Sequence, residues 1–209
     1  MRNAILLSVI LLFAAADCLA REIISVGGCR IRPGTLCTNM NLTGAKLSEA
    51  NLAHSQFTRS VLAGADLSGA NLDQSDLSRA DLRNADLHSA SLLRANARGA
   101  RFDHANLRGA TLKGAYLQNS NLTGVDLTKA NLSGANLANA RLDGAQLQDA
   151  DLRRANLRAC NLKGASLVTA QLQGANFTSA DLTDADLTGA NIDHANFSRA
   201  RTTGCKGCP

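Results

Sequence analysis

The chain has 209 residues, 45% of them hydrophobic, yet it holds no Trp, one Tyr and only 3% aromatic residues. A conventional globular core uses more aromatic side chains, so this composition argues against one. Two prolines in the whole chain argue against a disordered linker. Lys and Arg (22) outnumber Asp and Glu (17), and a net charge of +5 favours anionic partners.

The first twenty residues, MRNAILLSVILLFAAADCLA, differ from the rest of the chain. Arg2 precedes an apolar run that ends at Ala16, which is the layout of a secretory signal peptide. The run is shorter than the roughly 20 apolar residues that a membrane span needs. We expect residues 1–20 to be a signal peptide, cleaved after Ala16 or Ala20. The mature chain is then exported, to a periplasm, a lumen or the medium, and has no transmembrane segment.

A large apolar residue occupies 31 of 32 consecutive central sites, spaced five residues apart from Leu42 to Phe197, and Ala97 occupies the remaining one. Position two before the central site is Ala in 25 of the 32 repeats. On a helix, a step of five residues turns the side chain by about 140° net, so these leucines would scatter around the axis. In a strand, the central residue and the residue two positions before it point to the same side. The next inward residue comes three positions after the central one, so a bend must interrupt the alternation. The pattern predicts a bend in every repeat, where Gly, Ser, Asn and Asp gather two places after the central site.

The uninterrupted A(D/N)LXX motif resembles the pentapeptide-repeat family over about 160 of the 209 residues. The resemblance implies an all-β fold, a right-handed quadrilateral β-helix in which four pentapeptides make one square coil. Thirty-two repeats then give about eight coils, and a rod on the order of 38 Å long at roughly 4.8 Å per stacked strand. We expect an N-terminal cap over residues 21–40, the solenoid over 41–200 and a short tail over 201–209.

Four cysteines lie near the ends of the mature chain. Cys29 and Cys37 flank RIRPGTL, whose Pro-Gly pair favours a turn, and Cys205 and Cys208 form GCKGC. In an exported chain we interpret them as two local disulfides that staple the ends of the stack. A zinc site made of all four is opposed by their placement at opposite ends of the rod, and a redox-active CxxC lacks a βαβ context. No metal or cofactor is expected.

Two central positions of one coil depart from leucine, Ala97 and Phe102. We interpret Phe102 as filling the space that Ala97 leaves, with a kink or a binding notch as the alternative. Cys160 replaces an inward Ala, and we expect a buried and unreactive thiol there.

When successive repeats are assigned in turn to the four walls of the expected solenoid, acidic and basic residues gather on different walls. The wall that begins at Leu47 carries three Lys or Arg and six Asp or Glu. The wall that begins at Phe57 has one acidic residue, Asp76, and five arginines: Arg59, Arg79, Arg98, Arg158 and Arg199. The segment DLRRANLR adds Arg153 and Arg154 near Arg158.

These arginines are either solubilising charges or a binding surface for a nucleic acid, an acidic polysaccharide or a phospholipid headgroup. No aromatic residues interleave with them, which argues against a platform for single-stranded nucleic acid.

Nothing in the sequence brings catalytic groups together. The histidines, His54, His88, His104 and His194, fall in different coils, and the aspartates occupy ordinary repeat positions. The best-known members of the family resemble duplex DNA and act on DNA gyrase through a strongly acidic surface, whereas this chain is basic. We expect a non-enzymatic, exported scaffold for an unknown protein or anionic surface, with an electrostatic binding module as the alternative. Exposed strand edges at the ends would allow an end-to-end homodimer.

Overall fold

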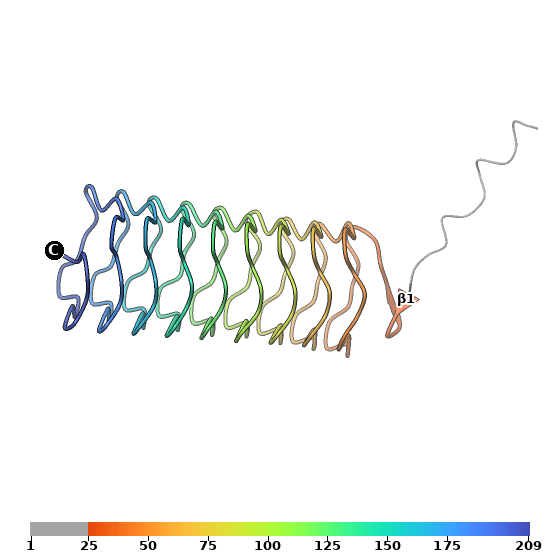
Figure 1. Ribbon diagram of the computed structural model, residues 1–209. Helices are drawn as coiled ribbons and strands as arrows, with labels where there is room; N and C mark the ends of the chain where they lie inside the picture. The colour runs from red at the N-terminus through yellow and green to blue at the C-terminus, as the bar shows by residue number, and fades with distance from the viewer. Residues whose placement is uncertain (1–24) are drawn as a thin grey trace, which may run out of the picture.

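The computed structural model describes residues 25–209, which form a single straight shaft of stacked coils (Figure 1). The expected signal peptide lies outside the described residues. The two regular strands in this range are β1 (Ser25–Val26) and β2 (Cys29–Arg30), an antiparallel hairpin in which Val26 pairs with Cys29. Among the described residues, no helix is long and apolar enough to cross a bilayer.

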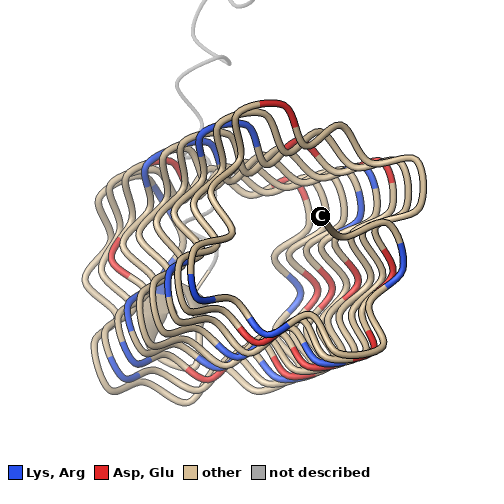
Figure 2. Cartoon of the chain, turned by 90° about the vertical axis from the view of Figure 1, so that its left-hand side faces the viewer, with Lys and Arg blue, Asp and Glu red and all other residues tan. Residues whose placement is uncertain are grey.

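The rest of the shaft is built from single parallel bridges between residues 20 positions apart, from Leu36 with Gln56 to Asp186 with Lys206. Four pentapeptides therefore complete one turn, as the family resemblance implies, and the view along the shaft shows a four-sided tube (Figure 2). The ladder extends beyond the expected limits of 41–200 at both ends. At the N-terminal end, polar Thr35 and Cys37 occupy the two inward positions and are buried, so the repeat there lacks the usual Ala and Leu.

Each repeat bonds to both neighbouring coils. In the repeat around Leu137, the Leu137 N–H donates to the Asn156 carbonyl (2.8 Å) of the next coil. The Asn136 N–H donates to the Ala115 carbonyl (2.9 Å) of the preceding coil. A third bond, from the Ala140 N–H to the Leu137 carbonyl (2.8 Å), closes a β-turn within the repeat.

The bend falls where the sequence predicts it. From Asn39 to Gly204, every residue two places after a central site has a positive φ, between 54° and 70°. Gly and Asn adopt this left-handed conformation at little cost, which explains why they gather at this position.

Asp or Asn before the central residue completes the turn. The Asp181 carboxylate accepts the Thr183 N–H (3.1 Å) and the Thr183 hydroxyl (2.6 Å), and the same contact to the residue two places on recurs along the shaft. These side chains therefore satisfy backbone donors in the bends.

The central residues and the small residues before them fill the interior. Every central side chain from Leu42 to Leu187 is at most 2% exposed. Where Ser replaces Ala, at Ser120, its hydroxyl donates to the Leu117 carbonyl (2.7 Å). Each buried leucine contributes roughly 1.5 to 3 kcal/mol, and each coil depends on the coils directly above and below it.

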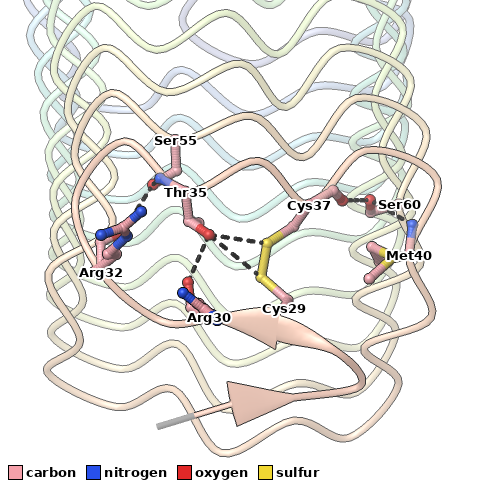
Figure 3. The surroundings of a disulfide bond; sticks show 8 residues. All are labelled: Cys29, Arg30, Arg32, Thr35, Cys37, Met40, Ser55 and Ser60. Carbon is pink, nitrogen blue, oxygen red and sulfur yellow. Dashed lines mark hydrogen bonds between the residues drawn. A yellow bond between two sulfur atoms is a disulfide. The ribbon is translucent and has the colours of Figure 1, made fainter. Parts of the chain in front are cut away.

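The N-terminal end of the shaft is covered. Cys29 and Cys37 lie at disulfide distance, with Cα atoms 5.5 Å apart, and this bond ties the β1–β2 hairpin to the first coil (Figure 3). The Thr35 N–H donates to the Arg32 carbonyl (3.3 Å), which forms the expected turn at Pro33-Gly34. The β1–β2 hairpin precedes this turn, and Gly27 and Gly28, which join its strands, both have the positive φ of a tight two-residue turn.

The C-terminal end is more open. Cys205 and Cys208 also lie at disulfide distance, with Cα atoms 5.8 Å apart. The inward side chains Ile192 and Phe197 are only partly buried, whereas their counterparts in the first coil are fully buried. The last coil thus leaves part of the interior uncovered.

Candidate interaction surface

The bridge register assigns every outward residue to one of four faces, each named here after its first central residue. The Phe57 face comprises the outward residues of the repeats centred on Phe57, Leu77, Ala97, Leu117, Leu137, Leu157, Phe177 and Phe197. Their bridging residues form one column. The Leu47 face lies on the opposite side of the shaft, since two repeats of four separate them. The Leu42 and Leu52 faces lie between.

Five of the seven candidate arginines share the Phe57 face: Arg59, Arg79, Arg98, Arg158 and Arg199. All five are exposed. Arg153 and Arg154 lie on the adjacent Leu52 face, so the DLRRANLR segment is divided between two sides of the shaft.

Within residues 25–209, Arg153 is the one candidate arginine that forms an ion pair. Arg153 binds both carboxylate oxygens of Asp151 (2.8 and 2.7 Å), and its side-chain hydrogen bond lowers the pKa of Asp151. Arg83 binds Asp81 in the same way (2.8 and 2.6 Å). Other pairs join the following residues: Arg101 and Asp103, Arg108 and Asp126, Arg141 and Asp143, Lys163 and Asp181, Arg201 and Asp181. Within residues 25–209, no ion pair includes an arginine of the Phe57 face, so their charges are free to meet a ligand.

The Phe57 face also carries the single tyrosine. The Arg98 guanidinium lies 4.4 Å from the centroid of the Tyr116 ring, in a cation–π contact, and its Nη1 donates to Asn96 Oδ1 (2.9 Å). Tyr116 is 42% exposed and is one of two exposed large hydrophobic side chains in the described range.

Sequence reasoning missed this pair, although a signal exists. Residues 18 positions apart face each other across adjacent coils, as Arg108 and Asp126 also do.

The Leu47 face has the opposite charge. It carries six acidic residues: Glu49, Asp66, Asp86, Asp126, Asp149 and Asp186. A shallow hollow of about 360 Å³ lies at Gly109 on this face, with His88, Arg108 and Lys129 on its rim. Charged segments form rows along the shaft, with both signs present (Figure 2).

The described residues contain no arrangement of catalytic groups. His88 Nδ1 contacts Asp86 Oδ1 (2.9 Å), but both side chains are about half exposed. In residues 25–209, no hydrogen bond joins His88 to a Ser, Thr or Cys, and no group of His, Cys, Asp and Glu is placed to hold a metal ion. Burial raises the pKa of the Cys160 thiol to about 12, because the interior disfavours the thiolate.

The pentapeptide-repeat profile matches the chain in eight copies, over residues 41–79, 65–103, 75–114, 130–167 and 170–206. The chain belongs to the pentapeptide-repeat family. Proteins of this family form right-handed β-helices, the fold that the resemblance implied. A search of curated proteins found no match.

Several solved structures are similar to this pentapeptide-repeat protein. HetL, involved in heterocyst differentiation regulation in the cyanobacterium Nostoc sp. strain PCC 7120, is 29% identical, with 81% of this chain and 88% of HetL covered and a TM-score of 0.36. Trypsin-treated QnrB1, a plasmid-mediated fluoroquinolone resistance protein, is 23% identical, with 77% and 86% covered and a TM-score of 0.49. A protein of the Arabidopsis thaliana thylakoid lumen is 31% identical, with 53% and 67% covered and a TM-score of 0.25.

Proposed function

We propose that this pentapeptide-repeat protein is exported and acts, without catalysis, as a rod of about eight coils on which a partner docks. The observation that carries the proposal is that side chains at different repeat positions have different locations and roles. Central residues and the small residues before them are buried, and most Asp and Asn side chains before them serve the bends. The remaining outward side chains form long faces of fixed spacing, which suits binding along a surface better than chemistry in a cleft.

The export step rests on the sequence of residues 1–20. Fractionation of the native host, with N-terminal sequencing of the recovered protein, tests it. A chain that begins at Asp17 or Arg21 in an exported fraction supports the proposal. A chain that retains Met1 and stays in the cytoplasm contradicts it.

A second candidate is electrostatic binding of an anionic partner by the Phe57 face. Its specific support is the charge of this face: within residues 25–209 none of its five arginines forms an ion pair, and Asp76 is its single acidic residue. An arginine without a carboxylate partner loses no existing pair when it binds an external anion.

Salt dependence and charge removal test this candidate. The variant Arg59→Asn, Arg79→Asn, Arg98→Ser removes three positive charges from the Phe57 face. Asn tolerates the positive φ of the first two positions (57° and 58°). Affinity capture from the exported fraction should recover partners with the wild-type chain and lose them with the variant. Equal recovery would leave the scaffold proposal intact and remove the electrostatic one.

We do not transfer DNA mimicry directed at gyrase to this chain. That activity depends on a strongly acidic surface, whereas this rod is basic overall and confines its acidic excess largely to the Leu47 face. A salt-sensitive interaction of the purified protein with gyrase would reverse this judgement.

We also propose that two rods can associate through their C-terminal coils. Ile192 and Phe197 are only partly buried there, and the tail that follows Arg201 does not cover them fully. Sedimentation across a range of protein concentrations tests the association. A mass that rises with concentration supports it, and a monomer mass at all concentrations contradicts it.

A further inference from the structure

The Phe57 face combines three features along one side of the shaft. Arg59, Arg79 and Arg98 lie toward its N-terminal part and the exposed ring of Tyr116 lies in the middle. A column of asparagines continues beyond it, on the part of the face that also carries Arg158 and Arg199. We propose that this surface binds an acidic polysaccharide along the shaft; the proposal rests on the electrostatic function proposed above.

The arginines supply the charge. Arg59 and Arg79 occupy the same position in adjacent coils, and Arg98 lies in the next coil. Stacked coils are roughly 4.8 Å apart, so the backbone positions that bear these arginines are closely spaced along the shaft. A guanidinium presents a planar pair of donors that matches a carboxylate or sulfate group on each anionic sugar.

Tyr116 supplies the apolar contact. Arg98 lies over its ring at 4.4 Å, which holds the ring in place beside the arginine row. Sugar rings present C–H faces that pack on aromatic carbon, and an aromatic side chain with a polar tip suits a surface that is partly wet. Arg98 covers one side of the ring, and we expect the exposed part of Tyr116 to contact one sugar while neighbouring sugars engage the arginines.

The asparagine column supplies hydrogen bonds for hydroxyl groups. The column of bridging residues continues from Tyr116 through Asn136, Asn156, Asn176 and Asn196. Their Oδ1 atoms accept backbone N–H groups within the bends, as Asn136 does from Ala138 (3.2 Å). Asn156 donates to Asn136 Oδ1 (3.2 Å), while in residues 25–209 no hydrogen bond uses the amide N–H groups of Asn136, Asn176 or Asn196. These donors lie on the same face as the arginines.

Two other polyanions fit the face less well. Single-stranded nucleic acid is held by several aromatic side chains on which successive bases stack, and this face has one. Binding to an anionic membrane is strengthened by apolar side chains that enter the bilayer beside the basic ones. In the described range, the exposed large hydrophobic residues are Leu36 and Tyr116 alone.

The chain provides its own probe for binding. It holds one Tyr and no Trp, so its intrinsic fluorescence comes from Tyr116 alone. We would titrate the processed, disulfide-bonded protein with polygalacturonate, uncharged dextran, oligothymidylate and phosphatidylglycerol vesicles, each at low and moderate salt. The expected result is a change in Tyr116 emission with polygalacturonate, lost as salt rises, and none with dextran.

Two triple variants, each lacking three positive charges, distinguish binding by the Phe57 face from binding by the Leu52 face. The test variant is Arg59→Asn, Arg79→Asn, Arg98→Ser, and the control is Arg94→Asn, Arg154→Asn, Lys113→Ser. The control removes the same charge from the same repeat positions of the Leu52 face, where in the described range these side chains are also without ion pairs. We expect the test variant to bind polygalacturonate about tenfold more weakly and the control to lose much less. Tyr116→Leu, followed by calorimetry, should weaken binding severalfold.

The outcomes separate the two proposals. Binding of oligothymidylate or vesicles as tight as that of polygalacturonate, and lost in the test variant, overturns the polysaccharide and keeps the electrostatic face. Equal weakening by both triple variants overturns the assignment to the Phe57 face. Binding to none of the polyanions overturns both.

Discussion

Phe177 and Phe197 stack across adjacent coils, with ring centroids 4.9 Å apart and ring planes within 6° of parallel. The two rings occupy the same central position one turn apart, so the stack follows directly from the 20-residue register. Phe177 is fully buried, while Phe197 belongs to the open last coil.

Because both residues are phenylalanine at the same repeat position, substituting each in turn shows how burial changes its contribution to stability. Phe177→Ala should lower the free energy of unfolding by about 3 to 5 kcal/mol, because it leaves a cavity between two coils. Phe197→Ala should lower the free energy of unfolding by clearly less, since the Phe197 ring is already partly exposed. Urea unfolding measures both, and equal costs would contradict the open C-terminal end.

Ala97 and Phe102 test the packing of one coil. Both are buried, at 1% and 0% exposure, and Ala97 stacks between Leu77 and Leu117 in its column. If Phe102 fills the space that Ala97 leaves, Ala97→Leu overpacks the interior and leaves the free energy of unfolding unchanged or lower. A clear gain in the urea midpoint would show instead that an empty space remains at Ala97.

Thr169 tests how much the strained backbone of a bend lowers the free energy of unfolding. It is a β-branched residue at a bend position with φ of 57°, a conformation that such side chains strongly disfavour. Thr169→Gly should raise the free energy of unfolding by about 1 kcal/mol despite the loss of the hydrogen bond from the Thr169 hydroxyl to Asp149 (2.6 Å). The matched control is Gly164→Thr in the preceding repeat (φ 62°), which should destabilise the chain. Destabilisation by Thr169→Gly would mean that the hydrogen bond outweighs the strain.

Acid should weaken the rod through its paired aspartates. Hydrogen bonds from Arg83 and Arg153 lower the pKa of Asp81 and Asp151 below the usual 3.8. A carboxylate with a lowered pKa stabilises the folded chain fully above its unfolded pKa, and this contribution is lost as pH falls through the folded value. The urea midpoint should therefore stay level from about pH 7 to 5 and fall below about pH 4.

The double variant Asp81→Asn, Asp151→Asn provides the control. It should be less stable than the wild type at neutral pH, and the difference should shrink in acid, where the wild-type carboxylates also lose their charge. A difference that stays constant across the pH range would exclude these pairs as its source.

Much of the fold follows from the sequence because one short-range rule repeats. Leu137 and Asn139 illustrate it: the first is large and apolar and points inward, and the second tolerates positive φ and bends the chain. The number of repeats per turn came only from the family resemblance, since the spacing alone permits other polygons. The limits of the ladder were missed where Thr35 and Cys37 replace the usual residues.

The surface was predictable only in part. Adding the 20-residue turn to the sequence places Arg59 and Arg79 in line and shows that Arg153 lies on another side. Which arginines are paired could not be read from spacing alone, because pairing depends on side-chain conformers. Arg153 reaches back to Asp151, two residues away, whereas Arg98 turns toward Tyr116 in the next coil.

The alternation of inward and outward side chains underlies every face described above, and the reactivity of two adjacent thiols tests it most directly. Cys160 is buried, with its pKa raised to about 12, while Ala159 beside it is exposed. Native protein should leave Cys160 unmodified by a disulfide reagent until it is unfolded, whereas the variant Ala159→Cys, Cys160→Ala should react at once. Equally fast reaction of the two folded proteins would contradict the account.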